Sequence, residues 1–384
     1  HECSSAASDV YKRQVNMKDP IKVFGNVGSP YTQKILALLR YRNIPYTVSW
    51  GDVVHNLSLL KIEPPKPVLL PTIVLKNYDG KNICKTDKTP IIRYLEEINK
   101  TKSVIPHHPV LNFLNYLLED FADEWTTKYM FHYRWHFEQD AENAKKMLVL
   151  QHKLNIDNEL MEQFSEAIAD RQINRLWVVG SNNETENLID QSYKRYLKLL
   201  ESHLTISTFM FGQRPSSADF GMYGQLSQLV GFDPTPRDIA YKISPRTISW
   251  VNIMSDLSGL HNKGGIGEFF GIDNNKDTDS ELNYFKDNDC GWFDVNSIPK
   301  SLLDIFNEIG RVYIPCLIAN ARAFDNGDKI WETKIDNAVW KQKTFPYQAK
   351  CLKWIKDEFN KLSEDNKEIT LQILKGSGCE KILN

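Results

Sequence analysis

The chain is poor in cysteine, and the cysteines that it has are scattered. Only six occur in 384 residues, and no two of them form a Cys-x-x-Cys pair. With Cys3 set aside, because it lies in a segment excluded below, the remaining five are Cys84, Cys290, Cys316, Cys351 and Cys379. Dispersed thiols in odd number are typical of a reducing compartment and argue against a disulfide framework or a zinc site. We therefore expect a cytoplasmic protein whose thiols are free and mostly buried as small apolar groups.

Long apolar runs and an excess of charge of either sign are also absent. No stretch approaches the roughly 18 consecutive apolar residues of a membrane span, and no signal peptide follows Met17. The 47 basic and 49 acidic residues leave a formal net charge of −2. This balance gives no argument for nucleic acid or an anionic membrane as a partner.

The first residues do not read as part of the protein. Ser4 to Gln14, with the sequence Ser-Ser-Ala-Ala-Ser-Asp-Val-Tyr-Lys-Arg-Gln, looks like the in-frame translation of a sequencing adapter. We exclude residues 1–14 from fold reasoning and expect the natural start at Met17, with a truncated clone as the alternative. The remaining length suits two domains, with room for a third packed element.

Residues 20–102 alternate between strand and helix patterns. Strands are expected at 21–24 and 46–50, separated by a helix over 31–42. An irregular Pro-rich passage at 63–67 precedes two strands, at 72–76 and 82–85, which are joined across Asp79-Gly80. Ile91, Ile92, Leu95 and Ile98 mark the apolar face of a closing helix. This order predicts a thioredoxin-like domain with a four-stranded mixed sheet.

The rest of the chain reads mostly as helix, which makes the fold class α+β. An all-α domain is expected over 108–258, with helices at 110–137, 141–151, 157–178, 185–204, 217–230 and 245–257. Ser216 and Asp219 fit a capping box. A C-terminal extension over 259–384 would begin with a loop to about 296. A helix over 299–324, a small hairpin at 331–335 and 339–342, a helix over 347–362 and a frayed end would follow.

The most informative segment is the turn after the first strand. An apolar run stops at Gly25, and Ser29-Pro30 then opens the helix that follows. Serine is favoured as an N-cap, and proline at the first helical position, so Ser29 is expected to cap this helix. A hydroxyl held there lies beside amide donors that stabilise an anion, such as a thiolate.

Four motifs, taken in this order and spacing, resemble the glutathione S-transferase family. They are Ser29-Pro30-Tyr31 after the first strand, Leu69-Leu70-Pro71-Thr72 before the third, Asp87-Lys88-Thr89-Pro90-Ile91-Ile92-Arg93-Tyr94-Leu95 at the last helix of the first domain, and Arg214-Pro215-Ser216-Ser217-Ala218-Asp219-Phe220 in the second. The resemblance covers roughly residues 20–257. The segment after it looks like the extension of some bacterial-type members.

The resemblance implies a glutathione site. Ser29 would donate its hydroxyl to the glutathione sulfur, with Tyr31 as the substitute donor. Leu70, before a cis Pro71, would present its backbone to the cysteinyl part. Asp87 and Lys88 would hold the γ-glutamyl end, although Lys88 stands where the family usually has Ser. The alternatives are that Ser29 is only a helix cap, competing for the same oxygen, and that Lys88 lies in solvent.

A second-substrate pocket would be lined from the long aromatic helix of the second domain. Its candidates are Phe121, Trp125, Tyr129, His132 and Tyr133, with a packed core as their alternative role. His132 and His136 are four residues apart, but no His-Glu-x-x-His arrangement occurs, and we expect no metal. Arg134 and Arg214 would serve either anionic substrates or salt bridges between helices.

We therefore expect a cytoplasmic glutathione transferase-like enzyme of the detoxification type. The thiolate of bound glutathione would attack a small electrophile, and the resemblance implies a homodimer. One alternative is a non-catalytic binding or scaffold protein on the same fold, because fold does not fix function. Another is a glutathione-dependent isomerase or dehalogenase, which differs only in the acceptor.

Overall fold

The computed structural model describes residues 19–77, 80–260 and 291–383. The adapter-like residues, Asp79 and Cys290 lie outside these ranges. Four strands form the N-terminal sheet: β1 (Ile21–Gly25), β2 (Tyr46–Trp50), β3 (Thr72–Lys76) and β4 (Asn82–Thr86). Their order in the sheet is β2-β1-β3-β4. β1 pairs with β2 in parallel, whereas β3 is antiparallel to both of its neighbours. The predicted thioredoxin-like sheet is confirmed.

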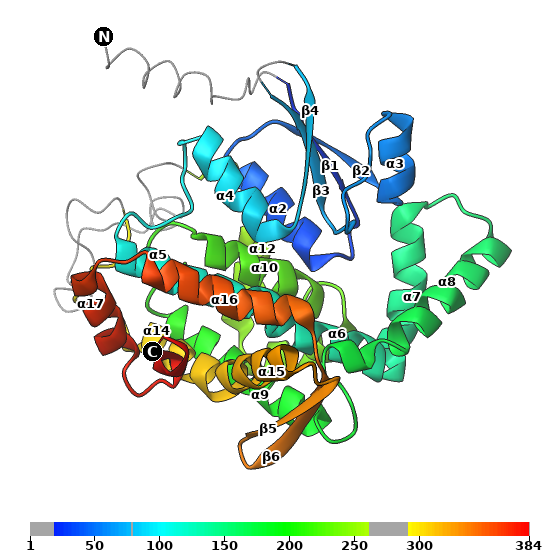
Figure 1. Ribbon diagram of the computed structural model, residues 1–384. Coiled ribbons are helices and arrows are strands. Elements are labelled where there is room, and N and C mark those ends of the chain that lie inside the picture. Colours follow the sequence, from blue (N-terminus) through cyan, green and yellow to red (C-terminus); the bar gives the residue numbers. More distant parts are fainter. Residues whose placement is uncertain (1–18, 78–79, 261–290, 384) are drawn as a thin grey trace, which may run out of the picture.

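Helices cover both faces of this sheet, because side chains alternate along each strand. Val23 and Ile73 share a core with α2 (Pro30–Tyr41) and α4 (Lys88–Ile98). Phe24 and Val74 instead pack against α3 (Val53–Leu59) on the opposite face (Figure 1). The short helix α3 is absent from the sequence-based expectation, which has no helix between 50 and 63.

The second domain is helical, as predicted, but its first helix is broken. The expected helix over 110–137 is two helices, α5 (Pro109–Glu124) and α6 (Thr126–His136), which meet at Trp125. The Thr126 hydroxyl donates to the Ala122 carbonyl four residues back, a contact that bends helices. The Lys128 amide bonds the Trp125 carbonyl at 2.9 Å, which tightens the turn.

The other helices of this domain follow the expected order. They are α7 (Glu138–His152), α8 (Asn158–Ile173), the 3₁₀ turn η1 (Leu176–Val178), α9 (Glu186–His203), α10 (Ser217–Leu229), α11 (Pro234–Ile243) and α12 (Pro245–Met254). The capping box at Ser216 and Asp219 is confirmed. Helix α11 is an addition that the sequence analysis missed.

Among the described residues, the C-terminal extension is mostly helical. It contains α14 (Lys300–Glu308), the π-helical turn η3 (Ile309–Tyr313), α15 (Ile314–Asn326), the hairpin β5 (Ile330–Ile335) and β6 (Ala338–Lys343), α16 (Pro346–Asn360), α17 (Glu364–Leu374) and η4 (Cys379–Ile382). The expectation of a frayed end is wrong, because Cys379 and Ile382 are buried. Gly310 lets the last turn approach, since a Cβ there would lie 1.9 Å from the Ser377 carbonyl oxygen.

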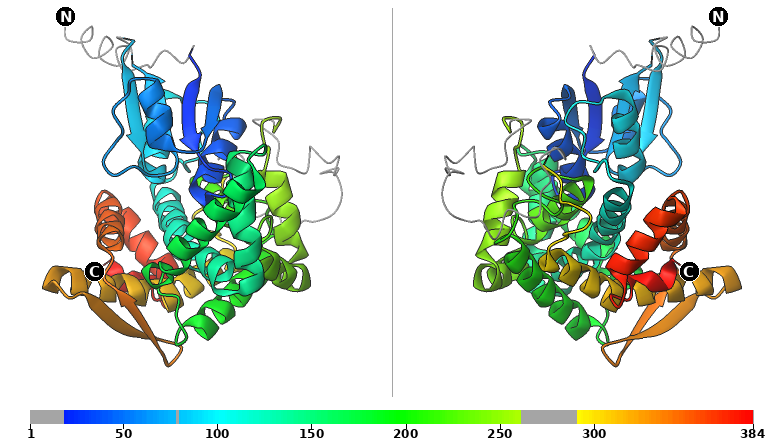
Figure 2. Two further views of the ribbon diagram at one scale, coloured as in Figure 1. Left: turned by 90° about the vertical axis from the view of Figure 1, so that its right-hand side faces the viewer. Right: turned by 90° about the vertical axis from the view of Figure 1, so that its left-hand side faces the viewer.

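One continuous apolar core joins the sheet domain, the helical domain and the extension. The sheet domain lies at one end of the helical domain, and the extension lies along its side (Figure 2). Within the described ranges, no helix is long and apolar enough to cross a membrane. Cys84, Cys316, Cys351 and Cys379 are free thiols, as predicted.

Candidate functional site

Strand register gathers the predicted glutathione-site residues at one edge of the sheet. Phe24 pairs with Thr72, and Thr72 pairs with Thr86, so these three residues form one cross-strand row. The residues just beyond this row are Gly25, Pro71 and Asp87. The loop after Gly25 leads directly to Ser29 at the start of α2. The first three of the four motifs, which are far apart in sequence, therefore meet at one place.

Ser29 caps α2, and its hydroxyl can still donate. Its Oγ accepts a hydrogen bond from the Thr32 amide at 3.3 Å, and 9% of the residue is exposed. A hydroxyl has two acceptor lone pairs and one hydrogen to donate. Capping uses a lone pair, and no acceptor for the Ser29 hydrogen occurs among the described residues. The expectation that the capping and anion-stabilising roles compete is corrected, because they use different parts of the group.

The loop before Ser29 is fixed by the helical domain. Arg134 of α6 donates to the Gly28 carbonyl at 3.0 Å and forms an ion pair with Asp233 at 2.9 Å. Helix α10 packs against the first turn of α2 at Gly224, where a Cβ would lie 2.5 Å from the Pro30 carbonyl oxygen. Arg134 is thus a buried structural cation, which confirms the salt-bridge alternative. Arg214 donates to the Ser103 carbonyl and lies over the Trp292 ring.

The backbone of Leu70 is free to bind a ligand. The Leu70–Pro71 peptide bond is cis, as predicted. The preceding carbonyl, that of Leu69, accepts hydrogen bonds from the hydroxyls of Thr72 and Thr86 at 2.8 and 3.2 Å. In the described part of the chain, neither the N–H nor the C=O of Leu70 has a hydrogen-bond partner. An extended peptide can pair with these two groups as it would with the edge of a sheet.

Asp87 stands at the uncapped start of α4. Its φ is +74°, and its side chain makes no capping hydrogen bond. The first-turn amides of α4 therefore remain available to an anionic group. The Asp87 carboxylate accepts from the Tyr347 hydroxyl, with both oxygens 3.0 Å from it. Tyr347 belongs to α16 of the extension, so the extension reaches the predicted γ-glutamyl position.

Lys88 is buried, so the alternative that it lies in solvent is wrong, whereas its role in binding glutathione stays a prediction. Only 7% of it is exposed, and its Nζ lies 2.8 Å from Glu124 Oε1. The same ammonium lies over the rings of Tyr31 and Tyr347, 4.5 and 5.0 Å from their centroids. Burial alone would lower the pKa of Lys88, but Glu124 and Asp123 raise it well above its usual value. Lys88 is therefore a permanent cation whose partner is a protein carboxylate.

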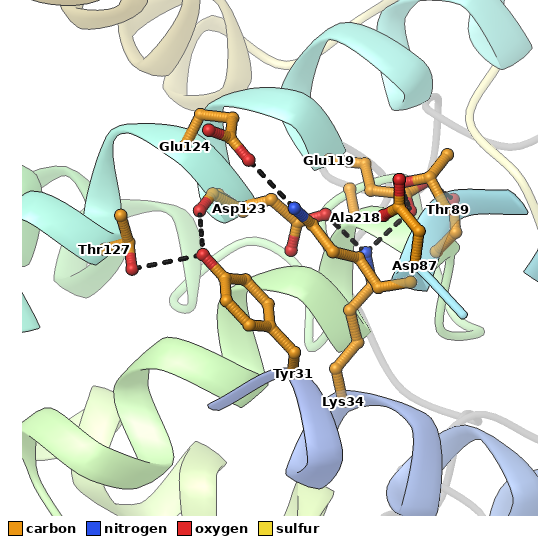
Figure 3. A network of polar contacts seen from close by, with 12 residues as sticks. Tyr31, Lys34, Asp87, Thr89, Glu119, Asp123, Glu124, Thr127 and Ala218 are labelled. Carbon is orange, nitrogen blue, oxygen red and sulfur yellow. Dashed lines mark hydrogen bonds and ion pairs between the residues drawn. The ribbon is translucent and has the colours of Figure 1, made fainter. Parts of the chain in front are cut away.

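A second buried lysine, Lys34 of α2, lies behind Lys88. Its Nζ is 2.7 Å from both Glu119 Oε1 and Asp123 Oδ2 of α5 (Figure 3). Thr89 adds a hydrogen bond to Glu119 at 3.1 Å. Burial raises the pKa of Asp123, whereas in Glu119 the cations Lys34 and Arg93 outweigh burial and lower the pKa. Sequence analysis missed Lys34, although its position four residues before the buried Leu38 places it on the apolar stripe of α2.

The hydroxyl of Tyr31 points to the junction of α5 and α6. It donates to the Asp123 carbonyl at 3.1 Å and lies 3.2 Å from Thr127 Oγ1, within hydrogen-bond distance. Burial raises the pKa of Tyr31. Both contacts are visible in Figure 3. Its role as a substitute for Ser29 stays a prediction.

The five aromatic candidates for a second-substrate pocket lie inside the helical domain. Phe121, Trp125, Tyr129, His132 and Tyr133 are all fully buried. The Trp125 indole donates to the Tyr129 hydroxyl at 2.7 Å, and the Tyr133 hydroxyl donates to Asp190 at 2.8 Å. These are the contacts of a packed core, and a second-substrate role for the five residues stays a prediction.

His132 and His136 form contacts other than a metal site. Their rings stack with centroids 4.6 Å apart, His132 Nδ1 bonds Ser181, and His136 pairs with Glu186. Among the residues that the structure describes, no group of three or more His, Cys, Asp or Glu side chains is placed to hold a metal ion.

The match to a known protein family lies in the first domain. Residues 28–98 match the sequence model of the glutathione S-transferase N-terminal domain. Glutathione S-transferase U8 of Arabidopsis thaliana is 28% identical over 116 residues, which are 29% of this chain and 48% of that protein. Glutathione S-transferase U4 of the same plant is 24% identical over 107 residues, which are 28% of this chain and 46% of that protein. The chain thus spans about half the length of the curated relatives it matches.

Two solved structures resemble the chain at low identity. A glutathione S-transferase of Ceriporiopsis subvermispora in complex with glutathione is 18% identical with a TM-score of 0.41, over 62% of this chain and 98% of that one. A maleylacetoacetate isomerase of Anaeromyxobacter dehalogenans is 11% identical with a TM-score of 0.34, and the alignment covers 61% of this chain and 90% of that one.

The matched domain, its sheet order and the gathered motifs define a thioredoxin-like domain followed by a helical one. The match to the glutathione S-transferase family covers residues 28–98, within the N-terminal domain.

Proposed function

We propose that the protein is a glutathione transferase-like enzyme that binds glutathione along the edge formed by Ser29, Leu70 and Asp87. The observation that carries this proposal is the Ser29 hydroxyl. It stands at the N-terminus of α2 with a hydrogen to donate, on the same edge as an unpaired backbone and an uncapped helix.

Each part of the tripeptide has a matching group at this edge. The N–H and C=O of Leu70 would pair with the cysteinyl backbone, and the first-turn amides of α4 would take the glutamyl carboxylate. The Asp87 carboxylate would take the glutamyl ammonium. Lys88 is neutralised by Glu124, so it contributes to packing rather than to direct binding.

The chemical contribution is to lower the pKa of the bound thiol. A free thiol has a pKa of about 8.5 and is mostly protonated at neutral pH, and each unit of lowering corresponds to about 1.4 kcal/mol. A hydrogen bond from Ser29 to the thiolate, together with the helix terminus, supplies about one to three units. The thiolate would then attack a small electrophile held beside it.

The test is Ser29→Ala. We expect the apparent pKa of bound glutathione to rise by about one unit or more, measured by thiolate absorbance and by a pH–rate profile. The variant also loses the α2 cap, at about 1 kcal/mol. The matched control is Ser363→Ala, which removes the N-cap serine of α17 and leaves the thiol unchanged. If the pKa of bound glutathione is unchanged in the Ser29 variant, then Tyr31 or the helix amides stabilise the thiolate instead.

A non-catalytic binding protein is the second candidate, and Lys88 favours it. At the position where the family usually has Ser, the chain has a cation committed to Glu124. Retention on immobilised glutathione separates the two candidates, since failure to bind at millimolar glutathione would favour the scaffold.

An isomerase or dehalogenase would bind glutathione in the same way and is distinguished by its acceptor. Homodimer formation and a cytoplasmic location are further parts of the proposal, based on the family resemblance and the free thiols.

A further inference from the structure

Tyr347 of the C-terminal extension contacts the edge of the sheet domain. Its hydroxyl lies 3.0 Å from each oxygen of the Asp87 carboxylate, 260 positions earlier in the chain. A carboxylate that accepts one hydroxyl between its two oxygens has its plane and direction fixed, yet it keeps lone pairs for another donor. Tyr347 therefore orients Asp87 without saturating it.

The rigid attachment of Tyr347 makes this orientation specific. Asn320 of α15 is buried, and its side chain donates to the Phe345 carbonyl at 2.9 Å and accepts from the Phe345 amide at 2.8 Å. The Trp331 indole of β5 donates to the same Asn320 oxygen at 3.0 Å. The segment that carries Tyr347 is thus held by α15 and by the hairpin, and α16 begins at Pro346, directly after Phe345.

The Tyr347 ring also couples the two ends of the proposed glutathione site. Lys88 Nζ lies over the rings of both Tyr31 and Tyr347. Tyr31 follows Ser29 by two residues, and Lys88 follows Asp87 directly. The extension therefore packs against the residues that adjoin both the thiol position and the glutamyl position.

A cavity of about 580 Å³ lies where these elements meet. Its walls include Lys88 and Thr89 from the first turn of α4, Glu124 from α5, and Tyr347 and Trp354 from α16. This volume is in the usual range for a small-molecule site. The extension supplies one wall of the cavity, so the space at the start of α4 is shaped by residues outside the domain that matches the family.

We infer that the extension completes the glutathione site and that Tyr347 is a positioning residue, which aims the Asp87 carboxylate at the glutamyl ammonium. This inference rests on the proposed function. It assigns a role to a segment beyond the matched residues 28–98. It also implies that the thiol chemistry at Ser29 proceeds without Tyr347, because the residue acts on the opposite end of the tripeptide.

The test is Tyr347→Phe in the full chain. The variant keeps the ring over Lys88 and removes only the hydroxyl. A hydrogen bond to a charged group is worth roughly a tenfold change in binding. We expect the Kd for glutathione, measured by calorimetry, and the KM for glutathione to rise about tenfold, with kcat and the pKa of the bound thiol unchanged.

The matched control is Tyr313→Phe. Tyr313 is also in the extension, and its hydroxyl also donates to a carboxylate, here Asp120 of α5, with Oδ2 2.6 Å away. This control tests whether the loss of any tyrosine hydroxyl in this interface weakens glutathione binding merely by destabilising the fold. We expect the Kd of Tyr313→Phe for glutathione to match that of the wild type. An equal loss in both variants, or unchanged binding in Tyr347→Phe, overturns the inference. Tighter binding in Tyr347→Phe also overturns it, because Tyr347 would then compete with the tripeptide. A wild-type protein that fails to bind glutathione refutes the proposed function itself.

Discussion

The sheet domain and the C-terminal extension both pack on α5, and they do so with different chemistry. The sheet domain presents Lys34 and Lys88 to the carboxylates Glu119, Asp123 and Glu124, all of them buried. The extension presents mainly rings. Phe359 packs on Phe113 with centroids 5.5 Å apart, and Trp340 packs on Trp125 at 5.1 Å.

The ionic contacts fix the orientation of the sheet domain, whereas the aromatic contacts of the extension contribute stability. A buried ion pair gains little over an apolar contact of similar volume, but breaking one by removing a single partner is costly. The ionic interface therefore admits one arrangement of the sheet domain, in which the Ser29 loop and the start of α4 meet α5. The aromatic interface buries area and tolerates small adjustments.

The largest expected effect is that of Lys34→Met. It leaves Glu119 and Asp123 buried without their shared cation, which should cost about 3–5 kcal/mol of unfolding free energy in urea titrations. The control is Lys76→Met, because Lys76 is half exposed and pairs with Asp19 at the surface. That variant should lose at most about 1 kcal/mol. Similar small losses in both would mean that the ionic interface does not constrain the domains.

Phe359→Ala tests the aromatic interface. The ring is 4% exposed and packs on Phe113, so its removal leaves a cavity that should cost about 3 kcal/mol. Phe359→Leu should restore most of this loss, because apolar volume and not ring geometry is required. Thermal and urea unfolding measure both variants. Failure of leucine to restore stability would show that this interface is as geometrically demanding as the ionic one.

The Asp120→Asn variant tests the difference between the two interfaces through the pH dependence of stability. Asp120 accepts a hydrogen bond from Tyr313 of the extension, and burial, aided by Glu124 and opposed by this hydrogen bond and by Lys88, raises its pKa from 3.8 to about 7. The folded protein then binds more protons than the unfolded chain between about pH 4 and 7, so this residue lowers stability as the pH rises through that window.

The asparagine variant should therefore gain stability over the wild type at pH 7.5, on the order of 1–3 kcal/mol, and little at pH 4. Urea midpoints measured at the two pH values test this. An equal difference at both pH values would show that Asp120 does not titrate in that window. The control is Asp357→Asn, on the cavity wall contributed by α16.

The local patterns were sufficient for the strands of the sheet domain and for the start of its first helix. Alternation and turn signals predicted all four strands, and Ser29-Pro30 predicted the α2 cap, because these features depend on neighbours in sequence. Helix α3 was missed because it is only one to two turns long and lies beside a Pro-rich passage. The break at Trp125 was missed because it depends on a side-chain bond from Thr126 to its own helix.

Charge partners could not be predicted in the same way. Lys88 was expected to reach a ligand or solvent, yet it pairs with Glu124 across two domains. Likewise, the aromatic residues of α5 and α6 were candidates for a pocket, and the structure places them in the core. A periodic pattern shows which face of a helix is apolar, but it does not show what covers that face.

The sequence by itself determined the order of elements, the cap at Ser29 and the family of the first domain, since each follows from residues close together in the chain. Only the tertiary structure decided that Lys34 and Lys88 are buried cations, and that Tyr347 meets Asp87 across 260 positions. The physical reason is that burial and pairing depend on how segments distant in sequence pack together, and chain-local preferences carry no information about those partners.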